Sequence, residues 1–224
     1  MNASLERMLH EIQVETADSS AWTGISAIEP AVIDALRQTD RGAFVGDDYR
    51  HLAYANRPLP VGFGQTISQP FIVALMTQLL LPRPDATMLE IGTGSCYQAA
   101  VLARLVKRVV SIEIIAALAE RATKQIAKLA IDNVDIHHGD GYRGWPELAP
   151  YDGIIVTACA TEIPPPLIEQ LKPGARMVIP VGAAYGPQDL LVVEKSLAGV
   201  TSSRSVLPVA FVPFKRSADD PALA

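Results

Sequence analysis

The segment from Glu90 to Tyr97, Glu-Ile-Gly-Thr-Gly-Ser-Cys-Tyr, carries an acid and two glycines directly after an apolar run. Gly92 and Gly94 let a backbone approach a ligand closely, and Ser95 leads into a helix whose free N–H groups can face that ligand. A dinucleotide turn needs a third glycine, but Tyr97 occupies that position and its ring would obstruct a pyrophosphate. The segment therefore favours a different nucleoside ligand.

Two more acids stand where the next two strands are expected to end. Glu113 follows Glu90 by 23 residues, close to the interval of about 20 residues at which a carboxylate binds ribose hydroxyls. Asp140 ends the third strand, where a carboxylate could meet an adenine amino group. Glu90 suits a ligand with positive charge near the turn, such as S-adenosylmethionine. Each acid alone could equally serve a turn or cap a helix, but together they predict one nucleoside pocket in which three carboxylates converge.

These residues must be positioned by alternating strands and helices. Strands are expected at 87–91, 108–112, 134–137, 153–157 and 176–181, and helices at 98–106, 116–130 and 165–171. This alternation predicts an α/β fold with a doubly wound, mostly parallel sheet. The segments 190–194 and 206–212 have no helix between them and predict an antiparallel hairpin at the sheet edge.

The sequence before this core predicts a helical extension. A short helix and a loop are expected in the first 27 residues, and further helices at 30–37 and 71–81. Residues 57–70 are rich in proline and glycine and predict an irregular loop, with Ser68 as the N-cap of the helix that follows. We therefore expect an N-terminal extension with a substrate loop at 1–85, a ligand-binding core at 86–216 and a flexible tail at 217–224.

Composition excludes several classes of protein. The 224 residues carry a net charge of −5 and no clustered basic face, which argues against nucleic-acid binding. No segment resembles a signal peptide or reaches the length of a membrane helix. Cys96 and Cys159 have no metal-binding spacing, and His137 and His138 lie on an expected strand. We expect two free thiols, no metal site and a cytoplasmic protein.

Four segments of the chain together resemble the protein-L-isoaspartate O-methyltransferases. They read "RHLAYANRPLPVGFGQTISQP", "MLEIGTGSCYQAAVLARLV", "HGDGYRGWPELAPYDGIIVTA" and "LKPGARMVIPVG". The resemblance implies a Rossmann-like methyltransferase that transfers a methyl group from S-adenosyl-L-methionine to the free α-carboxylate of L-isoaspartyl residues in proteins or peptides, releasing S-adenosyl-L-homocysteine. The ester then cyclises to a succinimide, which begins repair. We also expect a monomer that binds neither nucleic acid nor membrane.

The resemblance assigns the site residue by residue. Ser68 is implied as the active-site residue, and we expect it to orient the substrate carboxylate beside Gln65 and Thr66. No general base is needed, because a carboxylate with a pKa near 4 is already ionised at neutral pH. Ser68 could instead only cap its helix. The cofactor-binding residues implied are Glu90, Gly92, Gly94, Ser95, Glu113, Asp140, Gly141 and Thr157.

One departure from the family pattern falls in the glycine turn itself. Cys96 stands where the family has glycine. The substitution is harmless if the backbone there has an ordinary dihedral angle, it weakens cofactor binding if it does not, and a redox role is a third option. Two alternative functions also stay open: a methyltransferase for aspartyl or small-molecule carboxylates, and a peptide-binding relative without cofactor.

Overall fold

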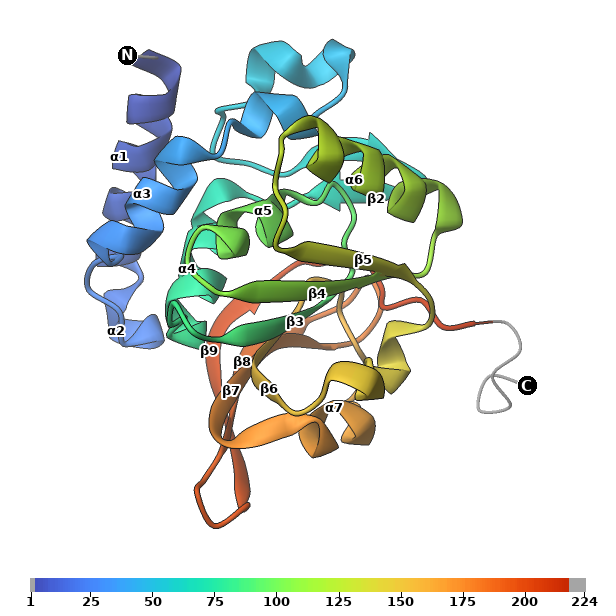
Figure 1. The fold of residues 1–224 in the computed structure, drawn as a ribbon. Helices are drawn as coiled ribbons and strands as arrows, with labels where there is room; N and C mark the ends of the chain where they lie inside the picture. The colour runs from blue at the N-terminus through green and yellow to red at the C-terminus, as the bar shows by residue number, and fades with distance from the viewer. Residues whose placement is uncertain (1–2, 218–224) are drawn as a thin grey trace.

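The computed structural model describes residues 3–217, built around a seven-stranded sheet with helices on both faces (Figure 1). The strand order is β5-β4-β3-β6-β7-β8-β9. The strands are β3 (Thr87–Ile91), β4 (Arg108–Glu113), β5 (Val134–His138), β6 (Tyr151–Val156), β7 (Leu171–Gly182), β8 (Gln188–Lys195) and β9 (Thr201–Val209). Because β3 pairs in parallel with both β4 and β6, the strand order reverses there. The doubly wound sheet and its antiparallel C-terminal hairpin are confirmed.

Alternate residues of the central strands face opposite helical layers. Met88 and Val109 belong to the apolar core beneath the first layer, whereas Leu89 and Val110 belong to the core on the other face. The first layer contains α4 (Pro70–Leu80), α5 (Tyr97–Ala103) and α6 (Ala116–Lys128), and the second contains α7 (Pro165–Glu169) with the 3-10 turns η3 (Gly141–Arg143) and η4 (Pro146–Leu148). This alternation decides which strand residues can reach a site at the strand ends.

The N-terminal extension thickens the first layer. It consists of α1 (Ala3–Asp18), α2 (Ser20–Thr23), α3 (Pro30–Gln38) and the 3-10 turns η1 (Arg41–Phe44) and η2 (Asp47–Leu52). The first helix is longer than expected, at 16 residues, because Met8, Leu9 and Ile12 form a buried face that packs on α4. The predicted boundary at residue 85 falls in the loop between α4 and β3. Apart from Ser217, the predicted tail lies outside the described residues.

The segment 57–70 contains a hairpin that the sequence analysis missed. β1 (Leu59–Gly62) and β2 (Gln65–Ile67) pair antiparallel. The expectation that Ser68 caps α4 is wrong, because the N-cap is Gln69. Proline disfavours helical geometry in the residue before it, so Pro70 places the last non-helical position at Gln69.

At the end of the sheet where β3, β6 and β7 begin, one carboxylate links several segments of the chain. Asp152, at the start of β6, accepts hydrogen bonds from the backbone of Thr87 at 2.9 Å and from Lys172 at 2.8 Å, and Arg83 lies 3.3 Å away. These contacts join the linker after α4 to the starts of β3, β6 and β7. Among residues 3–217, no helix combines the length and apolar character that crossing a membrane requires.

Candidate active site

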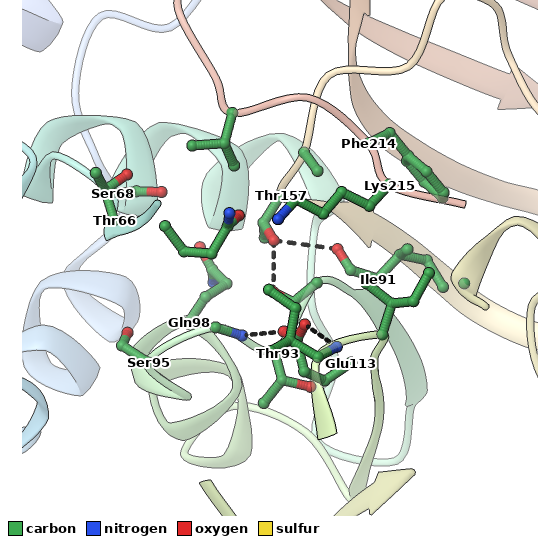
Figure 2. A pocket seen from close by; sticks show the side chains of 18 of the residues that line it. Thr66, Ser68, Ile91, Thr93, Ser95, Gln98, Glu113, Thr157, Phe214 and Lys215 are labelled. Carbon is green, nitrogen blue, oxygen red and sulfur yellow. Dashed lines mark hydrogen bonds between the residues drawn. The ribbon is translucent and has the colours of Figure 1, made fainter. Parts of the chain in front are cut away.

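A pocket lies beyond the carboxyl ends of β3, β4 and β6, where the strand order reverses (Figure 2). Its walls come from the turn after β3, the end of β4, the loop after β6, segment 65–68 and the C-terminal segment 212–215. Ligands bind at this position in doubly wound sheets. The site residues that line it, among those expected from the sequence, are Gln65, Thr66, Ser68, Gly92, Gly94, Ser95, Glu113, Gly141 and Thr157.

The glycine turn packs against the loop after β6. The Thr157 hydroxyl donates to the carbonyls of Ile91 and Gly92, at 3.1 and 2.6 Å. A Cβ at Gly92 would lie 2.5 Å from the Thr157 hydroxyl oxygen, and Gly92 has a φ of 93°. Only glycine therefore fits at this position, and the turn keeps its backbone open to the pocket.

Glu113 presents its carboxylate to the pocket from the end of β4. Its two oxygens accept hydrogen bonds from the backbone N–H groups of Gly94 and Ile115, at 2.7 and 2.9 Å. Each carboxylate oxygen has a second lone pair, so the group can still accept from ligand hydroxyls. The expected ribose-binding acid is thus fixed in orientation by the turn beside it.

Glu90 does not line the pocket. It pairs with Ser111 across β3 and β4, one position before β3 ends, and it is fully buried on the face that α5 covers. The expected convergence of three carboxylates in the pocket is therefore wrong. Strand alternation explains the error, since it turns the side chain of Ile91, and not that of Glu90, toward the pocket.

Glu90 instead supports the turn from below. The Ser111 hydroxyl donates to Glu90 Oε2 and lies 2.6 Å from the Thr93 hydroxyl, and Thr93 lines the pocket. Burial raises the pKa of Glu90 to about 8, although the hydrogen bond from Ser111 opposes that shift. Burial thus favours the protonated form of Glu90.

Asp140 also fails to reach the pocket. One of its oxygens accepts from the backbone of Tyr142 at 3.0 Å and caps η3, while the other lies 3.4 Å from Arg216 Nε and accepts from the backbone of Ser217 at 3.2 Å. Only 8% of the Asp140 side chain is exposed. The C-terminal segment thus covers this acid, and the adjacent Gly141 takes the place in the pocket wall.

Cys96 adopts the left-handed conformation. It is the N-cap of α5, with a φ of 69°, and it is fully buried. The suggestion that the residue has an ordinary dihedral angle is therefore wrong. Cys96 and Cys159 are both free, and burial raises the pKa of each thiol.

A second cavity adjoins the first at Ser68. Thr66, Ser68, Thr157 and Val212 line both cavities, and the second extends along residues 207–211 and past Glu15 of α1. The Ser68 hydroxyl forms no hydrogen bond with any residue between 3 and 217. It stands at the junction, available to a ligand on either side.

Sequence reasoning missed Arg41, whose side chain anchors the backbone of Ser68. The guanidinium is fully buried and donates to the carbonyls of Ala53, Arg57 and Ser68, at 2.5, 3.2 and 2.8 Å. Burial lowers its pKa to about 10, against the opposing influence of Tyr97. A lone arginine beside a helix end forms no recognisable motif, so the sequence carried no signal for this role.

Sequence reasoning also missed Lys215. Its side chain extends from the C-terminal segment into the pocket, and in Figure 2 its ammonium points toward Thr157. Among residues 3–217, no group of three or more His, Cys, Asp and Glu side chains is placed to hold a metal ion. His137 stacks on Trp145 with ring centroids 3.9 Å apart, away from the pocket walls.

A sheet of this topology with a glycine turn at its switch point defines a Rossmann-like fold that binds a nucleoside-containing ligand there. The family model for protein-L-isoaspartate(D-aspartate) O-methyltransferase matches residues 23–219. The chain belongs to this family.

Individual relatives agree with this assignment. A protein-L-isoaspartate O-methyltransferase 2 of Syntrophobacter fumaroxidans is 53% identical over 94% of this chain and 85% of its own length. A protein-L-isoaspartate O-methyltransferase 1 of Cupriavidus necator is 55% identical over 92% of this chain and 80% of its own. A solved protein-L-isoaspartate O-methyltransferase superposes with a TM-score of 0.81 and 27% identity, over 93% of this chain and 65% of that chain.

Proposed function

We propose that this protein transfers a methyl group from S-adenosyl-L-methionine to the free α-carboxylate of L-isoaspartyl residues in damaged proteins and peptides. The resulting ester can cyclise to a succinimide and so begin repair. One observation carries the proposal: the pocket at the strand-order reversal meets a second cavity at Ser68, within the segment that gives the family its motif.

The first pocket fits the cofactor. The carboxylate of Glu113 can accept from ribose hydroxyls, and the backbone at Gly92 and Gly94 can approach the ligand closely. The apolar side chains of Ile91 and Ile112 offer a surface for adenine. A solved Plasmodium falciparum structure in the same fold, at 23% identity and a TM-score of 0.78, is described as a complex with S-adenosyl-L-homocysteine.

The second cavity fits a polypeptide. It runs along the end of β9 and the residues after it, where backbone groups at a sheet edge can pair with an extended chain. We propose that the flanking peptide occupies this cavity and presents its carboxylate at Ser68.

The chain's residues bind and orient, and they need not move a proton. S-adenosyl-L-methionine, when bound, supplies a methyl group activated by a sulfonium. The acceptor carboxylate is ionised at neutral pH, so no base is required. Ser68 donates a hydrogen bond that fixes one carboxylate oxygen and leaves the other free to attack. Correct alignment of two reactants can contribute roughly 7–11 kcal/mol to lowering the barrier.

Ser68→Ala tests the proposed role. Loss of a hydrogen bond to a charged group should lower kcat/KM roughly 10- to 100-fold, while the melting temperature changes little. Ser203→Ala, on the exposed edge strand β9, is the matched control. Turnover of Ser68→Ala equal to that of Ser203→Ala would remove the hydroxyl from the mechanism.

The substrate class is tested by methyl transfer to an isoaspartyl peptide and to its aspartyl isomer. Strong preference for the isoaspartyl peptide supports the proposal, and equal rates would indicate a general carboxylate methyltransferase. Calorimetry with S-adenosyl-L-homocysteine tests the remaining alternative, since complete absence of binding would leave a peptide-binding relative. We propose in addition a cytoplasmic monomer that binds no nucleic acid, which size-exclusion chromatography and an RNA-binding assay can check.

A further inference from the structure

Two charged residues line the first pocket within the described part of the chain, Glu113 and Lys215. Glu113 is held by two backbone N–H groups. The Lys215 side chain is exposed, and its ammonium forms no hydrogen bond or ion pair with any residue between 3 and 217. A cation that enters a pocket without a partner there is available to an anionic ligand.

The direction of the Lys215 side chain selects among the anions that could bind. The ammonium points toward Thr157, which lines both cavities, as Ser68 does (Figure 2). Glu113 lines the first pocket only. The positive charge therefore faces the junction between the two cavities, where the acceptor carboxylate must lie under the proposed function.

The backbone that carries Lys215 is fixed on both sides. Phe214 N–H donates to the carbonyl of Cys159 at 2.8 Å. On the other side, Arg216 stacks over the Tyr142 ring at 3.5 Å and lies beside Asp140. The ammonium is thus delivered from an anchored segment, at the end of a flexible stem.

We infer that Lys215 binds the free α-carboxylate of the isoaspartyl residue and positions it beside Ser68. This inference rests on the proposed function. It makes Lys215 a substrate-positioning residue and gives the site a preference for acceptors that carry a full negative charge.

The chemistry specifies which kinetic parameter Lys215 controls. As the new C–O bond forms on the carboxylate, the methyl–sulfur bond breaks and its electron pair goes to sulfur, so the negative charge of the acceptor disappears. A neighbouring cation therefore stabilises the bound reactant at least as well as the transition state. Lys215 should lower KM for the peptide and contribute little to kcat.

The test compares Lys215→Met and Lys215→Arg with Lys107→Met. Lys107 is exposed, lies before β4 at the far end of the sheet, and its replacement changes the net charge equally. Lys215→Met should raise KM for an isoaspartyl peptide roughly tenfold, with kcat changed less than about twofold on the same reasoning. KM and kcat should stay close to the wild-type values in both Lys215→Arg and Lys107→Met.

Two binding measurements separate the outcomes. With S-adenosyl-L-homocysteine present, the Kd of a fluorescent isoaspartyl peptide should rise in Lys215→Met in step with KM, while the calorimetric Kd of S-adenosyl-L-homocysteine stays unchanged. A loss of affinity for S-adenosyl-L-homocysteine instead would assign the ammonium to the cofactor carboxylate and overturn the inference. If the wild type is active and KM is unchanged in Lys215→Met, the inference about Lys215 is overturned, but the proposed function is not. A wild type that binds S-adenosyl-L-homocysteine but methylates no isoaspartyl peptide would overturn the proposed function as well.

Discussion

Cys96 shows how a single residue can carry strain beside a binding site. A side chain in the left-handed conformation costs about 1–2 kcal/mol, and glycine avoids that cost. Cys96 caps α5 in this conformation, with its sulfur buried in the apolar core. Burial of the sulfur stabilises the folded protein and offsets part of this cost. The stability of the wild-type protein alone therefore does not reveal the strain in the backbone at Cys96.

A pair of variants isolates that term. Cys96→Gly and Cys96→Ala both remove the sulfur, but only glycine relieves the left-handed strain. Cys96→Gly should therefore exceed Cys96→Ala in free energy of unfolding by about 1 kcal/mol, after the entropy cost of glycine is included. Urea denaturation measures the difference, and equal or reversed stabilities would show that the backbone at this position is not strained.

Glu90 predicts a dependence of stability on pH. Its pKa is about 8 in the folded protein and near 4.5 without burial, so the folded state holds a proton that the unfolded chain releases between these values. The free energy of unfolding should therefore fall as pH rises from 4.5 to 8, by at most about 1.4 kcal/mol per pH unit. Glu90→Gln removes this contribution. The variant should gain stability relative to wild type across that range in pH-dependent urea titrations, and a constant difference would contradict the protonated state.

At the scale of elements, Arg41 connects η1 to the segment before α4. The planar guanidinium donates from two separate nitrogens, Nη1 to the carbonyl of Ala53 and Nη2 to those of Arg57 and Ser68. The single nitrogen of a lysine cannot occupy both positions. Arg41→Lys should lower the free energy of unfolding by about 1–3 kcal/mol for each carbonyl left without a donor. It should also lower kcat, because the Ser68 backbone loses its anchor. Arg50→Lys, at an exposed ion pair with Asp47, is the control and should change neither quantity.

The elements were predictable where a local pattern determines them. Alternating β-branched and helical segments predicted the core sheet, and the two glycines predicted the turn. The hairpin of β1 and β2 was not predicted, because proline and glycine are rare in strands and indicate a loop. These two short strands form only by pairing with each other. Glu90 was misplaced although strand alternation was available as a signal. Lys215 could not be found, since only the folded chain brings it into the pocket that the glycine turn lines.

At the scale of the whole molecule, we expect Asp152 to contribute to stability and not to ligand binding. It lies at the opposite end of the sheet from the pocket, and it joins the linker to three strand starts. Burial tends to raise its pKa, but hydrogen bonds from Lys172 and Thr87 prevail and lower it. The stabilisation is therefore present above the unfolded pKa near 3.8 and is lost as pH falls through the lower folded value.

Asp152→Asn should lower the free energy of unfolding at pH 7 by about 1.5–3 kcal/mol. The difference in free energy of unfolding between variant and wild type should shrink toward pH 3. At neutral pH, KM for S-adenosyl-L-methionine and KM for the isoaspartyl peptide should both stay the same. Chemical denaturation at the two pH values and steady-state kinetics measure these quantities. A changed KM would mean that the far end of the sheet influences the pocket.

The wall of four residues between the two cavities has a thermodynamic consequence. Thr66, Ser68, Thr157 and Val212 line both cavities, so a nucleoside in one cavity can change the affinity of the other cavity for a polypeptide. Thermodynamic linkage then requires the polypeptide to change the affinity for the nucleoside by the same factor. Titrating either partner at two fixed concentrations of the other therefore yields the mutual cooperativity of both.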